Sequence, residues 1–239
     1  MSLLTMIQTA AEEIGAFDAP TSVIGSTDQS VIQLEALANR AGKRLATRYN
    51  WQILVKEGTF LTVATESQGT MASLGSGAAD YSDFDHILND TVWNRTQSER
   101  VGGPLSANDW QQEKATISVG VYNYWRLRGD SFLMYPTPTA GETVAFEYVS
   151  KNWCESSGGT DQSAWAADTD TGILDEDLMT KDIIWRFYMA KGLPYDEQFR
   201  DYEVTLKDAL LRDGGKPIIS LGGRKRSSLP HVQDGDYTI

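Results

Sequence analysis

The chain has 239 residues, and its 41% hydrophobic content supports a sizeable core in one large domain or two modest ones. Its formal net charge of −12 argues against general binding to nucleic acid or to an anionic membrane surface, since both need clustered basic residues. The single cysteine, Cys154, excludes an intrachain disulfide and a cysteine-rich zinc site, so we expect a bystander thiol.

The sequence shows no targeting or membrane-spanning pattern. No apolar run approaches the roughly 20 residues that a membrane helix needs. The first residues lack a basic region followed by an apolar stretch, which is the pattern of a signal peptide. We therefore expect a soluble protein that folds in a reducing cytoplasm and does not associate with membranes.

Two amphipathic helices are predicted in the first fifty residues. A short one runs from about Ser2 to Glu13 and stops at Gly15. A long one runs from Asp28 to Tyr49, about 30 Å at helical rise, with capping side chains at its start. Apolar residues recur along its length at steps of three and four: Val31, Leu34, Ala38, Ala41, Leu45 and Tyr49. Such a stripe must pack against other helices.

The pattern changes to β structure between Trp51 and Trp153. Residues 51–56 and 60–63 read as strands separated by a glycine bend or bulge at Gly58. Further strands are expected at 91–96, 122–127, 131–135 and 143–153, with a two-residue hairpin turn at Gly129-Asp130. We expect an antiparallel meander or small barrel, which also contains a helix at 107–114 capped by Ser106 and a mobile polar loop at 65–80.

The last third returns to helices. A polar loop at 154–172 precedes a helix from Asp175 to Lys191, which Gly192 ends, and a second helix that Asp196 caps and that runs to Asp213. The predicted fold is α+β: a helical bundle core, an inserted antiparallel β region and an extended C-terminal tail. We expect one domain, 1–213, with the helical core at 1–50 and 173–213, the β insertion at 51–153, the polar loop at 154–172, and an arm at 214–239.

Candidate chemical groups are few. A Ser-His-Asp triad would have to use His86, the only histidine outside the tail region, and its neighbours Asp83 and Asp85 read as a solvated acidic turn. Asp168 and Asp170 faintly resemble a calcium loop, but a glycine stands where the third ligand belongs. We therefore predict no enzymatic activity, no cofactor and no metal. The sole basic cluster in the sequence is Arg224-Lys225-Arg226, in the tail.

Several strings resemble a known family, the head-to-tail adaptor (connector or head-completion) proteins of tailed bacteriophages, especially short-tailed ones. The order of helices, β insertion, helical hairpin and tail is also similar, and the resemblance covers about residues 3–217. The strings are TVWNRT at 91–96, GPLSANDWQQ at 103–112, YWRLRGD at 124–130, YPTPTAGETVAFEYVSKNW at 135–153 and LDEDLMTKDIIWRFYMAKGLPY at 174–195. The last twenty residues match nothing in the family.

The resemblance implies a structural virion protein of the neck, made in the host bacterial cytoplasm. It would form a ring of about twelve copies beneath the portal protein, extend the DNA channel, and receive the tail or nozzle proteins. DNA would pass through without sequence-specific binding, which suits an acidic lumen. Two alternatives stay open: a virion-associated cell-wall hydrolase, and a tail or baseplate subunit.

The tail is the predicted portal-docking arm. In relatives, a C-terminal extension often reaches up to the portal, and here apolar residues precede the basic cluster. A segment that orders on binding is a common docking device. The residues of the predicted arm are Lys216, Pro217, Ile218, Ile219, Leu221, Arg224, Lys225 and Arg226.

Overall fold

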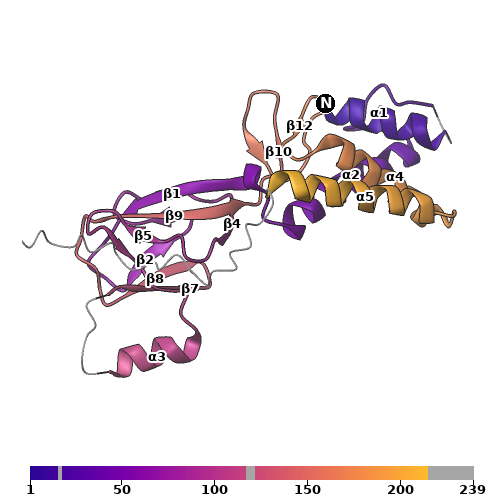
Figure 1. Ribbon diagram of the computed structural model, residues 1–239. Helices are drawn as coiled ribbons and strands as arrows, with labels where there is room; N and C mark the ends of the chain where they lie inside the picture. Colours follow the sequence, from indigo (N-terminus) through magenta and orange to yellow (C-terminus); the bar gives the residue numbers. More distant parts are fainter. Residues whose placement is uncertain (16–17, 117–121, 215–239) are drawn as a thin grey trace, which may run out of the picture.

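The computed structural model describes residues 1–15, 18–116 and 122–214. This part of the chain contains five α-helices and several antiparallel sheets, so the α+β prediction is confirmed. The molecule is elongated: most of the helices gather at one end together with the N-terminus, and the two larger sheets form the other end (Figure 1). The predicted docking-arm residues 216–226 lie outside the described residues.

The two N-terminal helices begin and end close to the predicted residues. Helix α1 (Leu3–Ile14) starts at Ser2, whose hydroxyl accepts a hydrogen bond from the Thr5 amide at 3.3 Å, and ends at Gly15 in the left-handed conformation. Helix α2 (Gln29–Arg48) starts at Asp28, whose carboxylate accepts from the Ser30 amide at 2.7 Å. The predicted stripe of α2 is buried, except for its last member, Tyr49, which is half-buried.

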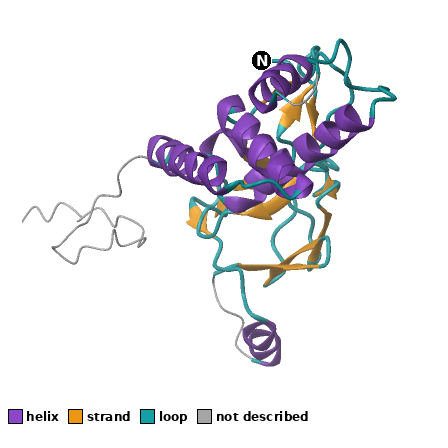
Figure 2. Cartoon of the chain, turned by 90° about the vertical axis from the view of Figure 1, so that its right-hand side faces the viewer, coloured by secondary structure: helices purple, strands orange, loops and turns teal. Residues whose placement is uncertain are grey.

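The C-terminal helices pack beside them. Helix α4 (Glu176–Lys191) is capped by Asp175 and ends at Gly192 as predicted, whereas α5 (Asp196–Asp213) is preceded by Tyr195 with no side-chain cap. Asp196 is therefore the first helical residue, and its predicted role as the cap is wrong. Helix α4 contacts α1, α2 and α5, so it is buried on more sides than its apolar stripe alone suggests. Figure 2 shows these helices together, seen from their end of the molecule.

Strand β9 (Thr143–Ser150) is the centre of the first sheet. It pairs antiparallel with β1 (Val55–Leu61) on one side and with β4 (Phe84–Ile87) and β5 (Trp93–Asn94) on the other, and β5 pairs with β6 (Glu99–Arg100). The predicted strand at 51–54 is instead the 3₁₀ turn η1 (Gln52–Leu54). The predicted bend at Gly58 is also wrong: the β1–β9 register is unbroken, and Gly58 lies opposite Phe146.

The second sheet runs β3 (Ser73–Leu74), β2 (Ser67–Thr70), β8 (Ser131–Tyr135) and β7 (Tyr124–Arg128). The hairpin turn between β7 and β8 is confirmed at Gly129, which has a φ of +61°. Because β8 and β9 belong to different sheets, the meander, one of the two arrangements predicted for this region, is wrong. The two sheets share one core, whose buried residues include Phe60, Met71, Leu74, Trp125, Phe132, Met134, Val144, Phe146 and Tyr148.

Two segments predicted as loops contain strands. The segment 65–80 holds β2 and β3, because Met71 and Leu74 bury side chains in the shared core and draw this Gly-rich stretch onto β8. The segment 154–172 forms a small sheet of β10 (Cys154–Glu155), β11 (Asp161–Gln162) and β12 (Thr171–Gly172). In both segments the local composition is polar, but a few side chains are buried: Met71 and Leu74 in the first, Cys154 and Trp165 in the second. Their burial stabilises strand pairing that the composition does not predict.

Helix α3 (Ala107–Ala115) stands apart from the other helices, beyond the sheets (Figure 1). Ser106 caps it as predicted: its hydroxyl accepts from the Asp109 amide at 3.2 Å. Only Trp110 is buried, with its ring 6.1 Å from that of Tyr135, measured between centroids. The other residues of α3 present a mainly polar surface to solvent.

Candidate functional site

Among the residues that the structure describes, His86 has no serine partner for a catalytic triad. It lies exposed on β4, where its Nδ1 is 2.7 Å from Asp85 Oδ2 and its Nε2 is 3.1 Å from Asn50 Oδ1. The two ring nitrogens thus contact a carboxylate and an amide oxygen, and neither contacts a serine hydroxyl. His86, Asp85 and Asn50 thus form a hydrogen-bonded group on the surface. This group does not supply the Ser-His contact that acyl transfer requires.

Asp83, predicted to be solvated, lies in a polar network that joins separate elements. Lys56 Nζ on β1 contacts Asp83 Oδ2 at 2.8 Å and Asp161 Oδ2 on β11 at 2.5 Å. Asp83 also accepts hydrogen bonds from Tyr148 and Ser150 on β9. Partial burial by itself raises the pKa of the Asp83 carboxyl, but these hydrogen bonds and the Lys56 charge hold that pKa below its ordinary value. The network fastens β1, β9 and the small sheet together.

Asp168 and Asp170, the pair considered for calcium, bind backbone amides instead. The Asp168 carboxylate accepts from the Val23 and Ile24 amides and from the Ser22 hydroxyl, which ties the segment before α2 to the one before β12. The buried Asp170 accepts from two amides of its own turn, Ala166 and Ala167, both at 2.8 Å. Across the described ranges, no three His, Cys, Asp or Glu side chains cluster in a way that would hold a metal ion.

Cys154 is chemically inert in this setting. It is buried on β10, and its thiol donates to the Gln162 carbonyl oxygen at 3.3 Å. Burial, together with the nearby charge of Asp170, raises the pKa of the thiol to about 12. Reactivity needs the thiolate, so the structure supports the expected bystander role.

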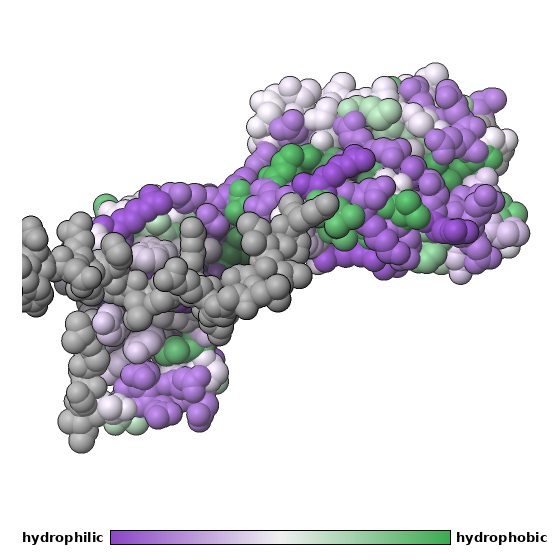
Figure 3. Space-filling view, in the orientation of Figure 1, coloured by the Kyte–Doolittle hydropathy of each residue, from purple (hydrophilic) through white to green (hydrophobic). Residues whose placement is uncertain are grey.

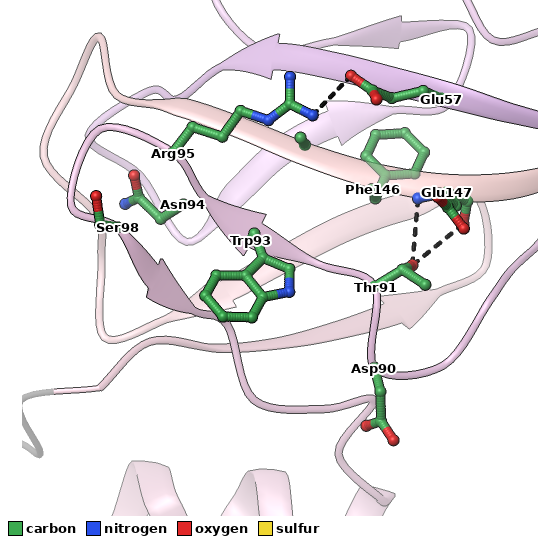
Figure 4. Close-up of a pocket in the computed structure, with 10 residues that line it drawn as sticks. Glu57, Asp90, Thr91, Trp93, Asn94, Arg95, Ser98, Phe146 and Glu147 are labelled. Carbon is green, nitrogen blue, oxygen red and sulfur yellow. Dashed lines mark hydrogen bonds and ion pairs between the residues drawn. The ribbon is translucent and has the colours of Figure 1, made fainter. Parts of the chain in front are cut away.

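One open hollow lies on the outer face of β1, β5 and β9 (Figure 4). Trp93 is 42% exposed there, unusual for so large an apolar side chain. On one side, Arg95 Nη2 contacts Glu57 Oε1 at 2.8 Å, and on another, the Thr91 hydroxyl accepts from the Glu147 amide at 3.2 Å. Glu57 and Arg95 neutralise each other, so the hollow offers an aromatic surface beside one paired set of charges. Such surfaces are typical of protein–protein contacts.

A second hollow lies where α5 ends. Its apolar wall comes from η1, the residues before α4 and the last turns of α5; the lining residues are Trp51, Ile53, Ile173, Leu174, Asp175, Ala209, Arg212 and Asp213. The Gln52 amide donates to Asp213 Oδ2 at 2.9 Å, which fixes η1 to the end of α5. The chain leaves the described part immediately beside this hollow, at Gly214.

In the described residues, the polar groups that sequence patterns single out bind other parts of the fold, and the surface carries exposed apolar residues such as Ile53 and Trp93. The model of the family described as SU10 adaptor protein matches residues 1–216, and the chain belongs to this family of phage adaptors. The resemblance stated from the sequence is confirmed. No curated protein matches the chain.

Membership of an adaptor family favours a non-enzymatic, structural role in the phage particle. Among the helices of the described ranges, none is both long enough and apolar enough to cross a bilayer. The sequence analysis missed the Asp83 network and the hollow at the end of α5. Both are built from side chains that lie far apart in the sequence. Local sequence patterns do not predict such long-range contacts.

Proposed function

We propose that this protein is the head-to-tail adaptor of a tailed phage, and that copies of it form a ring beneath the portal in the virion neck. The observation that carries the proposal is the family match over residues 1–216 of 239. The elongated shape supports it, because a helical end and a β end give one subunit separate surfaces for a portal and for tail components (Figure 1).

The ring would contain about twelve copies and would continue the DNA channel toward the tail proteins that attach to it. The net charge of −12 supports this role, because a negative lumen repels the duplex and leaves no adhesive sites along its path. DNA would then pass without sequence-specific contacts. In this proposal residues 1–213 act as one unit, in which the helical bundle supports the β insertion.

The arm that docks on the portal is proposed to be the segment after α5, residues 214–239. The segment follows the last amphipathic helix, α5, whose buried residues are Tyr202 and Leu206. The proposed contact residues are an apolar group followed by a basic group, suited to a groove with an acidic rim: Lys216, Pro217, Ile218, Ile219, Leu221, Arg224, Lys225 and Arg226.

Truncation tests this arm directly. A chain that ends at Asp213 is expected to keep its helix content by circular dichroism but to stop co-sedimenting with portal. A chain that ends at Arg226 keeps every proposed contact residue and serves as the matched control, with portal binding retained. Full binding by the shorter chain would move the portal contact to the helices or the β insertion.

A further inference from the structure

The hollow at the end of α5 is an apolar surface with rigid walls. Ile53, on η1, lines the hollow and is 60% exposed although it is a large aliphatic residue. The hollow has a volume of about 280 Å³. The Gln52–Asp213 hydrogen bond holds one wall to the other, so the hollow is preformed. Figure 3 shows apolar residues gathering near the point where the helical end meets the β end.

The position of this hollow along the chain indicates what covers it. Asp213 lines the hollow, and the next residues are Gly214, Gly215, Lys216 and Pro217, followed by Ile218 and Ile219. Two glycines allow the chain to reverse direction at little steric cost. Four residues of extended chain span at most about 14 Å, so Ile218 stays within that distance of Gly214. Closing so short a loop costs little entropy compared with recruiting a separate molecule.

Charge agrees with this occupant. The rim of the hollow carries two carboxylates, Asp175 and Asp213, and one guanidinium, Arg212. The aliphatic pair is preceded by the cation Lys216, which would pass the acidic side of the rim. The apolar wall, formed by Trp51, Ile53 and Ile173, matches the aliphatic side chains that follow. Apolar burial is the main favourable term for such a contact.

We propose that, in the chain free of portal, Ile218 and Ile219 occupy this hollow of their own subunit. The inference rests on the proposed function, because the same two residues belong to the proposed portal-docking arm. Intramolecular seating would therefore cover the adhesive part of the arm until a portal groove competes for it. The contact, which we call the arm latch, would keep free subunits from associating through exposed arms.

Disulfide trapping tests the arm latch in the full chain without portal. Ile53→Cys is combined with Ile219→Cys, and oxidation is followed by mass spectrometry and non-reducing electrophoresis. The native Cys154 is buried with a raised thiol pKa, so it does not compete. The matched control combines Val204→Cys with Ile219→Cys, because Val204 is also exposed, at 51%, and lies about 15 Å along α5 from Gly214.

We expect an intrachain disulfide for the Ile53 pair that forms at least tenfold faster than for the Val204 pair. Equal rates of disulfide formation for the two pairs would overturn the inference, because they would show that the arm has no preferred binding position on its own subunit. Disulfide-linked dimers would also overturn it, because the occupant would then be the arm of a second copy. Portal binding is measured separately, so failure of the docking arm would leave the trapping result standing.

A second measurement keeps the test independent of cysteine geometry. In the full chain, Ile53→Asp is expected to raise the hydrogen-exchange rate of the amides of residues 218–221 at least fivefold, whereas Val204→Asp leaves that rate unchanged. Unchanged exchange in the Ile53 variant would contradict the arm latch even if a disulfide forms.

Discussion

At the residue scale, the described part of the chain uses its buried charges to hold helices and strands in place. Asp182 on α4 accepts from Trp185 Nε1 at 2.8 Å and from Arg186 Nε at 2.7 Å, and both charged side chains are almost fully buried. The guanidinium of Arg186 also lies over the Trp185 ring, 4.3 Å from its centroid. A sequence pattern places Asp182 and Arg186 one helical turn apart but does not show that α2 and α5 enclose them.

Removing one partner of this buried pair is expected to be costly. Asp182→Ala leaves the Arg186 charge uncompensated in the core, so we expect a loss of about 3–5 kcal/mol in the free energy of unfolding. Asp177→Ala is the control, because it removes only an exposed i,i+4 contact to Lys181 at 3.4 Å and should cost less than about 1 kcal/mol. Urea denaturation of both variants measures the difference; equal losses would contradict the buried role.

The Asp83 network predicts a pH dependence of stability. The pKa of Asp83 is lower in the folded protein than its ordinary value of 3.8, so its contribution is present above that value and is lost as pH falls through the folded pKa. The pKa of Lys56 is raised by Asp161 and Asp83, against the opposing effect of burial, so its contribution is lost as pH rises through the folded pKa, above 10.5. The stabilisation is complete between these limits.

Asp83→Asn is therefore expected to destabilise the protein at pH 7, and the gap to the unmodified protein should shrink as pH falls below about 4. Asp85→Asn, at the exposed neighbour of His86, serves as the control and should lower the unfolding temperature at pH 7 by less than Asp83→Asn does. Thermal unfolding between pH 2.5 and 7 measures both. A gap that stays constant across this range would show that the Asp83 charge does not contribute.

At the element scale, helices were predicted well and sheets were not. Asp28, Ser106 and Asp175 cap the helices that they were expected to cap, because capping is decided within four residues of sequence. Strand pairing is decided by residues far apart: β2 joins β8 across about sixty residues, through pairs such as Gly69 with Phe132. The local composition of residues 65–80 predicted a loop, because the strand that pairs with this segment, β8, lies about sixty residues further along the chain.

Gly58 shows how a local rule misleads. A glycine within a strand suggested a bulge, but a Cβ at this position would lie 2.6 Å from the Phe146 ring. We expect Gly58→Ala to cost about 1–3 kcal/mol through overpacking. Gly77→Ala is the control, because a Cβ there meets nothing within 4 Å, and it should change stability by under about 0.5 kcal/mol. Similar midpoints in urea for the two variants would contradict this packing role.

At the scale of the whole molecule, an elongated subunit carries most of its helices at one end and the two larger sheets at the other, and α5 ends near its middle (Figures 1 and 2). The family resemblance predicted the class of protein from strings such as YWRLRGD, which occupy β7 and its turn. It did not predict the hollow at the end of α5, because residues from η1, the start of α4 and α5 meet only in the folded chain.

The adaptor role also predicts how copies associate. With a net charge of −12, free chains repel one another, so we expect monomers or small oligomers at moderate salt, and ring assembly on the portal. The most direct measurement is electron microscopy of the purified protein with and without its portal. The account predicts a ring of about twelve copies seated on one face of the portal; portal particles with no added density would contradict it.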